Sequence, residues 1–210
     1  MEQPIPDTKS DLSSILGQKV FAGKESSIYI NGIADDRYYI LWPNVERVYV
    51  GGTTKSINGI PTSENRELSI NDSKYEVSFS SYSFFRMNHE SKQTFNNIYA
   101  FVINNIFPRQ WSQFLQKINN GEWLSFNKFE VTKEAFYFRK MFGKYDKIDT
   151  NCILGCNIKI GFLYVQYQDH KNKLKEKCAG RVLDIPNIHL IQTYINKVIA
   201  DKTKPTPVSH

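Results

Sequence analysis

The chain has 210 residues, of which 40% are apolar, 14% aromatic and 23% charged, with a formal net charge of +6. This balance is typical of a folded protein and excludes a chain that is disordered throughout. No apolar run approaches the ~20 residues that a membrane-spanning helix needs, and the polar, acidic start of the chain does not resemble a signal peptide. We therefore expect a cytoplasmic protein with room for one large domain or two small ones.

The first half of the chain predicts antiparallel strands after a flexible lead. Residues 1–16 contain Pro4 and Pro6 and show no strong hydrophobic period, although a short helical turn is expected near residues 12–16. Asn31-Gly32 and Asp35-Asp36 are turn formers that separate β-rich segments. The predicted strands cover residues 27–30, 37–42, 44–50, 67–70 and 75–84.

The hydrophobic period then changes to that of helices. Apolar residues recur at intervals of three and four residues from Phe95 to Ile106, which predicts a helix over residues 91–105 with one face sealing a sheet. Pro108 is expected to interrupt it, and a second helix is predicted over residues 109–119. Asn120-Gly121 favours a left-handed stop, so the first unit is predicted to cover residues 17–120.

After Gly121 the order of elements starts again. Short strands are predicted over residues 129–131, 135–142, 147–152, 159–168 and 173–183. Asn187 follows Pro186 as a helix N-cap, and the helix it opens is expected to end near Lys202. The second unit is therefore predicted to cover residues 121–202, and residues 203–210 form a tail.

The two halves share a pattern in addition to their element order. Trp42 and Tyr145 each follow a strand pair and each precede an apolar residue three positions later, Val45 and Ile148. A helix closes each half about 40 residues further on. A repeat this long is not that of a solenoid, so the pattern favours two copies of a small β domain capped by a helix.

This order of elements resembles that of the pleckstrin-homology-like (PH-like) superfamily. The second half is similar to an uncharacterised bacterial group of PH-like proteins, in which an Ile-Pro-Asn motif opens the last helix, here Ile185-Pro186-Asn187. The resemblance covers residues 121–200 more fully than residues 17–120. It implies a β-rich α+β protein with two tandem units, each a bent antiparallel sheet or partly open barrel capped by a C-terminal helix. It also implies a binding or scaffolding role without naming a ligand.

The sequence indicates neither an enzyme nor a cofactor. It contains no Gly-x-Ser-x-Gly elbow, no phosphate loop and no His-Glu-x-x-His helix. Cys152, Cys156 and Cys178 are odd in number, which favours free thiols in a reducing compartment. Zinc ligation together with His170 or His189 stays open as the less favoured alternative, as does a cysteine nucleophile paired with His189.

The positive charge lies in the second half of the chain. Residues 1–120 carry 12 Lys and Arg against 12 Asp and Glu, whereas residues 121–210 carry 15 against 9. This asymmetry indicates an anionic partner, although a solvated basic face explains it equally well.

Two sets of basic residues are candidates for binding an anionic ligand. By resemblance to PH domains that hold a lipid headgroup with cations on their first two strands, the first set is Lys133, Arg139, Lys140 and Lys144. The second set recurs at period two, so in an extended strand its members would form a ridge on one face, and each exposed cation near an anionic membrane could contribute about 1 kcal/mol. This set is Lys171, Lys173, Lys175 and Lys177.

A protein or peptide is the partner that we expect. PH-like folds can accept an extended peptide along a sheet edge or in a groove beside the C-terminal helix, and two linked copies would add avidity. The alternative is peripheral recruitment to anionic membrane lipid through the basic second unit. Nucleic acid is not expected, because Arg139 and Arg181 are the only arginines in that half and the aromatic residues are needed in the core.

Overall fold

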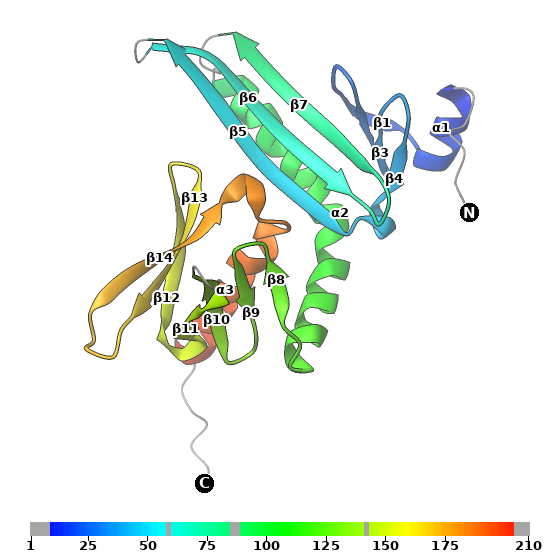
Figure 1. Cartoon of the computed structure of the whole chain (residues 1–210). Helices are drawn as coiled ribbons and strands as arrows, with labels where there is room; N and C mark the ends of the chain where they lie inside the picture. The colour runs from blue at the N-terminus through cyan, green and yellow to red at the C-terminus, as the bar shows by residue number, and fades with distance from the viewer. Residues whose placement is uncertain (1–8, 58–59, 85–88, 141–142, 204–210) are drawn as a thin grey trace. The chain divides into compact units, whose positions relative to one another are not determined.

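The computed structural model describes residues 9–57, 60–84, 89–140 and 143–203 (Figure 1). The first part of the predicted lead, residues 1–8, and the predicted tail from residue 204 onward lie outside these ranges. The chain divides into two compact units, Met1–Gln110 and Trp111–His210. Each is described by itself below.

The first unit contains a short helix, two sheets and most of a long helix. Helix α1 (Lys9–Leu16) lies where a short helical turn was expected. A four-stranded antiparallel sheet follows, with strands β1 (Lys19–Ala22), β2 (Ser27–Tyr29), β3 (Gly32–Ala34) and β4 (Tyr39–Leu41) in sequence order. After the 3-10 turn η1 (Trp42–Asn44) come a three-stranded sheet of β5 (Arg47–Ile57), β6 (Ile60–Asn71) and β7 (Glu76–Phe84), and then helix α2 (His89–Asn119).

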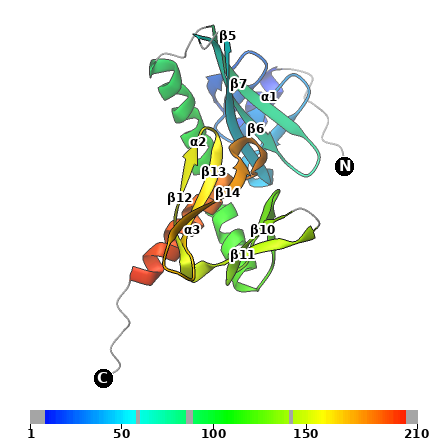
Figure 2. The same ribbon diagram turned by 60° about the vertical axis from the view of Figure 1, so that its left-hand side comes forward.

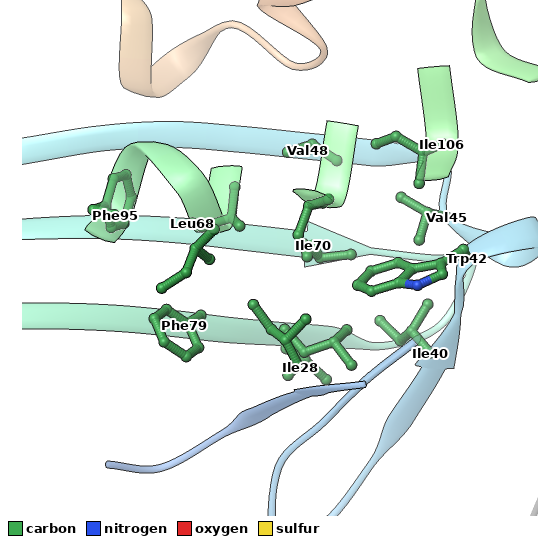
Figure 3. Close-up of a cluster of buried hydrophobic side chains, with 14 residues drawn as sticks. Ile28, Ile40, Trp42, Val45, Val48, Leu68, Ile70, Phe79, Phe95 and Ile106 are labelled. Carbon is green, nitrogen blue, oxygen red and sulfur yellow. The ribbon is translucent and has the colours of Figure 1, made fainter. Parts of the chain in front are cut away.

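The core of the first unit lies between its sheets and α2. Figure 3 shows Trp42 beside Ile40, Val45 and Ile70 within this cluster of buried side chains. The Trp42 indole N–H donates to the backbone carbonyl of Ile30 at 2.8 Å, so the only polar atom of this side chain has a partner. On α2, the buried side chains include Phe95, Ile98, Val102 and Ile106, which confirms the predicted apolar face.

Helix α2 is a single helix of 31 residues with Pro108 inside it, so the prediction of two helices separated by that proline is wrong. Proline removes one i→i−4 hydrogen bond and crowds the preceding turn. The buried face nevertheless continues at four-residue spacing, because Ile106, Gln110, Phe114 and Ile118 are all buried. The division between the two compact units falls within this helix, after Gln110.

The second unit repeats the order of two sheets and a closing helix. Its first sheet contains β8 (Leu124–Phe126), β9 (Phe129–Val131), β10 (Ala135–Arg139) and β11 (Tyr145–Asp149). The 3-10 turn η3 (Thr150–Cys152) leads to a three-stranded sheet of β12 (Ile153–Lys159), β13 (Phe162–Gln168) and β14 (Leu174–Arg181). The 3-10 turn η4 (Val182–Asp184) and helix α3 (Ile188–Thr203) complete the unit.

Aromatic side chains fill the core of the second unit. Phe129, Phe136 and Phe138 are fully buried, and the rings of Phe129 and Phe138 stack with centroids 5.7 Å apart. Tyr194 of α3 stacks on Phe136 at 6.2 Å. Helix α3 therefore packs through the Tyr194 ring on the sheet of β8 to β11. It also lies along β12 of the sheet of β12 to β14 (Figures 1 and 2).

The protein is thus a β-rich α+β protein with four antiparallel sheets, and among the described residues no sheet closes into a barrel. Several details differ from the predicted elements. Trp42 lies in η1, whereas Tyr145, its expected counterpart, lies in β11; the 3-10 turn that corresponds to η1 is η3, starting at Thr150. The segment predicted as one strand over residues 159–168 contains the turn between β12 and β13.

Candidate functional site

A cleft of about 570 Å³ opens in the second unit, between α3 and the last turns of α2. The edge contact between Phe114 of α2 and Tyr194 of α3, with ring centroids 5.3 Å apart, holds the two helices together beside it. The apolar part of its lining comes from both helices: Leu115 and Ile118 of α2, and Tyr194 and Val198 of α3. Burial, with nearby Glu134 adding to it, raises the pKa of the Tyr194 hydroxyl, so this group is neutral at physiological pH.

Three lysines and one carboxylate give the cleft its charge: Lys133, Lys197, Lys202 and Asp201. Lys197 and Asp201, one helical turn apart, form an ion pair at 2.6 Å. The Lys202 ammonium donates to the backbone carbonyl of Ile153 at 2.6 Å, and burial lowers its pKa. Within the described part of the chain, the structure gives no ion pair to Lys133 or Lys202, so the cleft is positive.

Lys133 is held at the cleft by its backbone. It lies in the turn between β9 and β10, where the Thr150 hydroxyl donates to its carbonyl oxygen at 3.0 Å. The side chain itself is exposed. Of the eight basic residues predicted as binding candidates, this is the one that lines the cleft.

The other members of the first predicted set lie on β10 and beyond it. Arg139 pairs with Glu130 of the neighbouring strand β9 at 2.6 Å, and this hydrogen bond raises the pKa of Arg139. Lys140 forms an ion pair with Asp146. Lys144 is exposed and forms no ion pair with any of the described residues. Two of the four predicted cations are therefore already matched by carboxylates.

The second predicted set is not a single extended row. Strand β14 begins at Leu174, so Lys171 and Lys173 lie in the turn before it, where their backbone N–H groups donate to Asp169 at 2.8 and 2.9 Å. Lys175 pairs with Asp169 at 2.9 Å, which together with the backbone donors lowers the pKa of Asp169 to about 2. Lys171 and Lys173 therefore lie outside the strand, and the charge of Lys175 is neutralised by Asp169.

Asp146 brings the two predicted sets together. Lys140 of the first set and Lys177 of the second both pair with this carboxylate, and these two partners lower its pKa. Sequence spacing could not indicate this arrangement, because Asp146 lies on β11 and Lys177 on β14 of the other sheet. Glu176 does not enter this cluster, because it pairs with Lys159 at 2.7 Å.

The three cysteines are free thiols that differ in solvent exposure. Cys152 and Cys156 are partly buried and Cys178 is exposed, and burial raises the pKa of the Cys156 thiol. His189 is buried on α3. Over the described ranges, no three His, Cys, Asp or Glu residues come together as a metal site.

The first unit has a cleft of opposite character, with a volume of about 640 Å³. Its carboxylates outnumber its cations, and the charged residues that line it are Lys24, Glu25, Asp35, Asp36, Arg37 and Glu76. Three of the carboxylates have partners within the unit, among them Asp36, which pairs with Arg37 at 3.7 Å. Asp35 accepts the backbone N–H groups of Arg37 and Tyr38 at 2.7 Å, and Glu76 accepts from the hydroxyl of Ser69. An acidic ligand would therefore favour the second unit.

Sequence reasoning missed most of the lysine-lined cleft. Lys197 and Asp201 carry a weak signal, since they form an i,i+4 pair on the predicted last helix. Leu115 and Ile118 carry no sequence signal for this cleft, because they line it only where the last turns of α2 pack within the second unit.

Neither a comparison with models of protein families nor one with curated proteins finds a match to this chain. No helix in the described ranges has the length and apolar character needed to cross a bilayer. The function must therefore be argued from the chemistry of the site.

Proposed function

We propose that this chain is a binding protein whose second unit holds an acidic, partly apolar peptide segment of a partner protein in the cleft between α2 and α3. The single observation that carries the proposal is the combination of an apolar lining with an excess of lysine over carboxylate. Apolar pockets give a peptide most of its affinity, while a few charged groups fix its orientation.

A concave site favours a peptide over a flat lipid surface. The apolar side chains lie between two helices, where a narrow segment enters but a bilayer does not. The basic residues outside the cleft support the membrane alternative less well than their number suggests, because Arg139, Lys140, Lys175 and Lys177 are in ion pairs. Surface cations that already have carboxylate partners attract an anionic surface weakly.

We also propose that each unit is a PH-like domain. A four-stranded sheet, a 3-10 turn, a three-stranded sheet and a helix follow one another in both units, which supports the proposal. This order agrees with an adaptor role, since the fold supplies sheet edges and a closing helix as binding surfaces.

Charge reversal in the cleft tests the proposed function. We expect Lys133→Glu to weaken binding of a fluorescein-labelled peptide of alternating Glu and Leu roughly tenfold, equal to about 1.4 kcal/mol, because it replaces attraction with repulsion. Fluorescence anisotropy at physiological salt measures the affinity. A Lys and Leu peptide of the same length should bind more weakly to the unaltered protein.

Lys144→Glu is the matched control. This residue is exposed, belongs to the same unit and undergoes the same change of charge, but it does not line the cleft. We expect its effect on the affinity to stay below about twofold. Equal losses in the two variants, or equal binding of the two peptides, would show that the protein attracts acidic peptides only through its overall charge.

A further inference from the structure

The turn between β12 and β13 contains an isoleucine in an unusual backbone conformation. Lys159 and Phe162 are paired across the hairpin, which leaves Ile160 and Gly161 as the two turn residues. Their φ angles are +50° and +74°. Two-residue turns with positive φ at both positions favour Asn-Gly, because asparagine and glycine tolerate the left-handed region.

A β-branched residue is poorly suited to this position. Its Cβ branches crowd the backbone when φ is positive, so a residue such as isoleucine is an outlier there. In the described part of the chain, the other non-glycine residues with positive φ are all asparagines: Asn127, Asn172 and Asn187. Ile160 therefore occupies a place where this protein otherwise uses asparagine, and the isoleucine costs stability.

No packing against the described residues offsets that cost. Ile160 is 97% exposed, the largest value among the exposed large apolar residues of the described ranges; the next is Leu174 at 67%. A strained conformation kept without an internal contact points to a contact outside the molecule. The Ile160 side chain, which would make this contact, is apolar and lies at the end of the β12–β13 hairpin.

Cations surround this turn. The Val182 N–H donates to the Gly161 carbonyl at 2.8 Å, and Arg181 is the cross-strand neighbour of Phe162, so Arg181 lies at the turn. Lys128 reaches the same end of the sheet, because its side chain lies over the Cα of Gly180. Among the described residues, Arg181 and Lys128 form no ion pair, whereas Lys159 pairs with Glu176.

We propose that the β12–β13 turn is a membrane anchor, with Ile160 inserted into the apolar layer of an anionic bilayer and Arg181 and Lys128 at the level of the lipid phosphates. A single apolar side chain at the end of a protruding hairpin enters a bilayer to shallow depth, and the cations beside it complement the anionic lipid headgroups. This charge complementarity favours lipid over an apolar pocket of a protein.

The anchor is a different surface from both the peptide cleft and the predicted lysine ridge. The turns at the two ends of the sheet β12–β14 point in opposite directions, with Ile160 at one and Lys171 and Lys173 at the other (Figure 1). The ridge turn also carries an exposed apolar residue, Leu174, whose backbone is an ordinary strand. Among the described residues, Ile160 is the one exposed apolar residue at positive φ.

Ile160→Asn separates binding from folding. Asparagine suits the left-handed conformation, so we expect the variant to unfold at a higher temperature than the unaltered protein while losing at least tenfold in binding to vesicles of phosphatidylcholine with phosphatidylserine. Cosedimentation at physiological salt measures the binding, and circular dichroism measures the melting temperature. Vesicles of phosphatidylcholine alone should bind the unaltered protein weakly.

Leu174→Asn is the matched control, since it removes an exposed apolar residue from the other end of the same sheet. We expect it to bind anionic vesicles as the unaltered protein does, and Arg181→Glu to bind less. The proposal is overturned if the unaltered protein does not sediment with anionic vesicles, if Ile160→Asn binds as well as it does, or if Leu174→Asn carries the loss instead. The peptide affinity of Ile160→Asn should be unchanged, so this proposal and the proposed function can fail independently.

Discussion

Replacing Trp42 by alanine is expected to destabilise the first unit by about 3–5 kcal/mol, the range for removing a large aromatic side chain from a core. The indole is 4% exposed and lies beside Ile40, Val45 and Ile70 (Figure 3). Its removal leaves a cavity that these neighbours can fill only in part. It also removes the N–H donor to the backbone carbonyl of Ile30. Urea unfolding followed by circular dichroism measures the free energy.

Two variants separate the contributions. Trp42→Phe keeps an aromatic ring but loses the indole N–H, so we expect a cost nearer 1–2 kcal/mol, roughly that of a lost hydrogen bond. Trp123→Ala removes a tryptophan that is 55% exposed and stacked on Tyr137 with centroids 4.3 Å apart. Its cost should not exceed about 1.5 kcal/mol. If Trp42→Ala cost no more than Trp123→Ala, burial of the Trp42 indole would not be a main contribution to the stability of the first unit.

Strong apolar periodicity in the sequence was sufficient to predict α3, but not the full length of α2, β5 or β6. The apolar spacing of α3 gave a helix opened at Asn187, and the helix runs from Ile188 to Thr203. Short strands are harder to predict from the sequence. The sequence predicts only a turn where strand β3 (Gly32–Ala34) lies, because Asn31-Gly32 is a turn signal. Gly32 serves another purpose as well: a Cβ there would overlap the backbone carbonyl of Ile40 on the neighbouring strand.

The candidate site shows a different limit. The residue types of Arg139, Lys140, Lys175 and Lys177 predicted a positive surface, but their carboxylate partners could not be read from spacing. Asp146 meets Lys177 only because β11 and β14 come together in the folded unit. The lysine-lined cleft depends on the end of α2 reaching α3. Pairings of this kind follow from tertiary packing, which local sequence patterns do not contain.

The stability of the second unit is expected to fall as the pH falls from about 6.5 to about 4, because of His189. Its side chain is 8% exposed, and burial lowers its pKa from 6.5 to about 4. Between these pH values the unfolded chain binds the proton and the folded chain does not, so protonation favours unfolding. The stabilisation is fully present above pH 6.5 and is lost as the pH falls. A shift of this size corresponds to about 3 kcal/mol in total.

The measurement is the free energy of unfolding at pH 7 and at pH 5, for the unaltered protein and for His189→Leu. We expect the unaltered protein to lose about 2 kcal/mol more than the variant over this interval, since a leucine has no proton to bind. Comparison with the variant removes the contribution of the carboxylates, among them Asp169, whose pKa is also lowered. His170→Leu, at an exposed position, should retain the pH dependence of the unaltered protein. If His189→Leu lost as much stability between pH 7 and pH 5 as the unaltered protein, the buried imidazole of His189 would not be the group whose protonation destabilises the second unit.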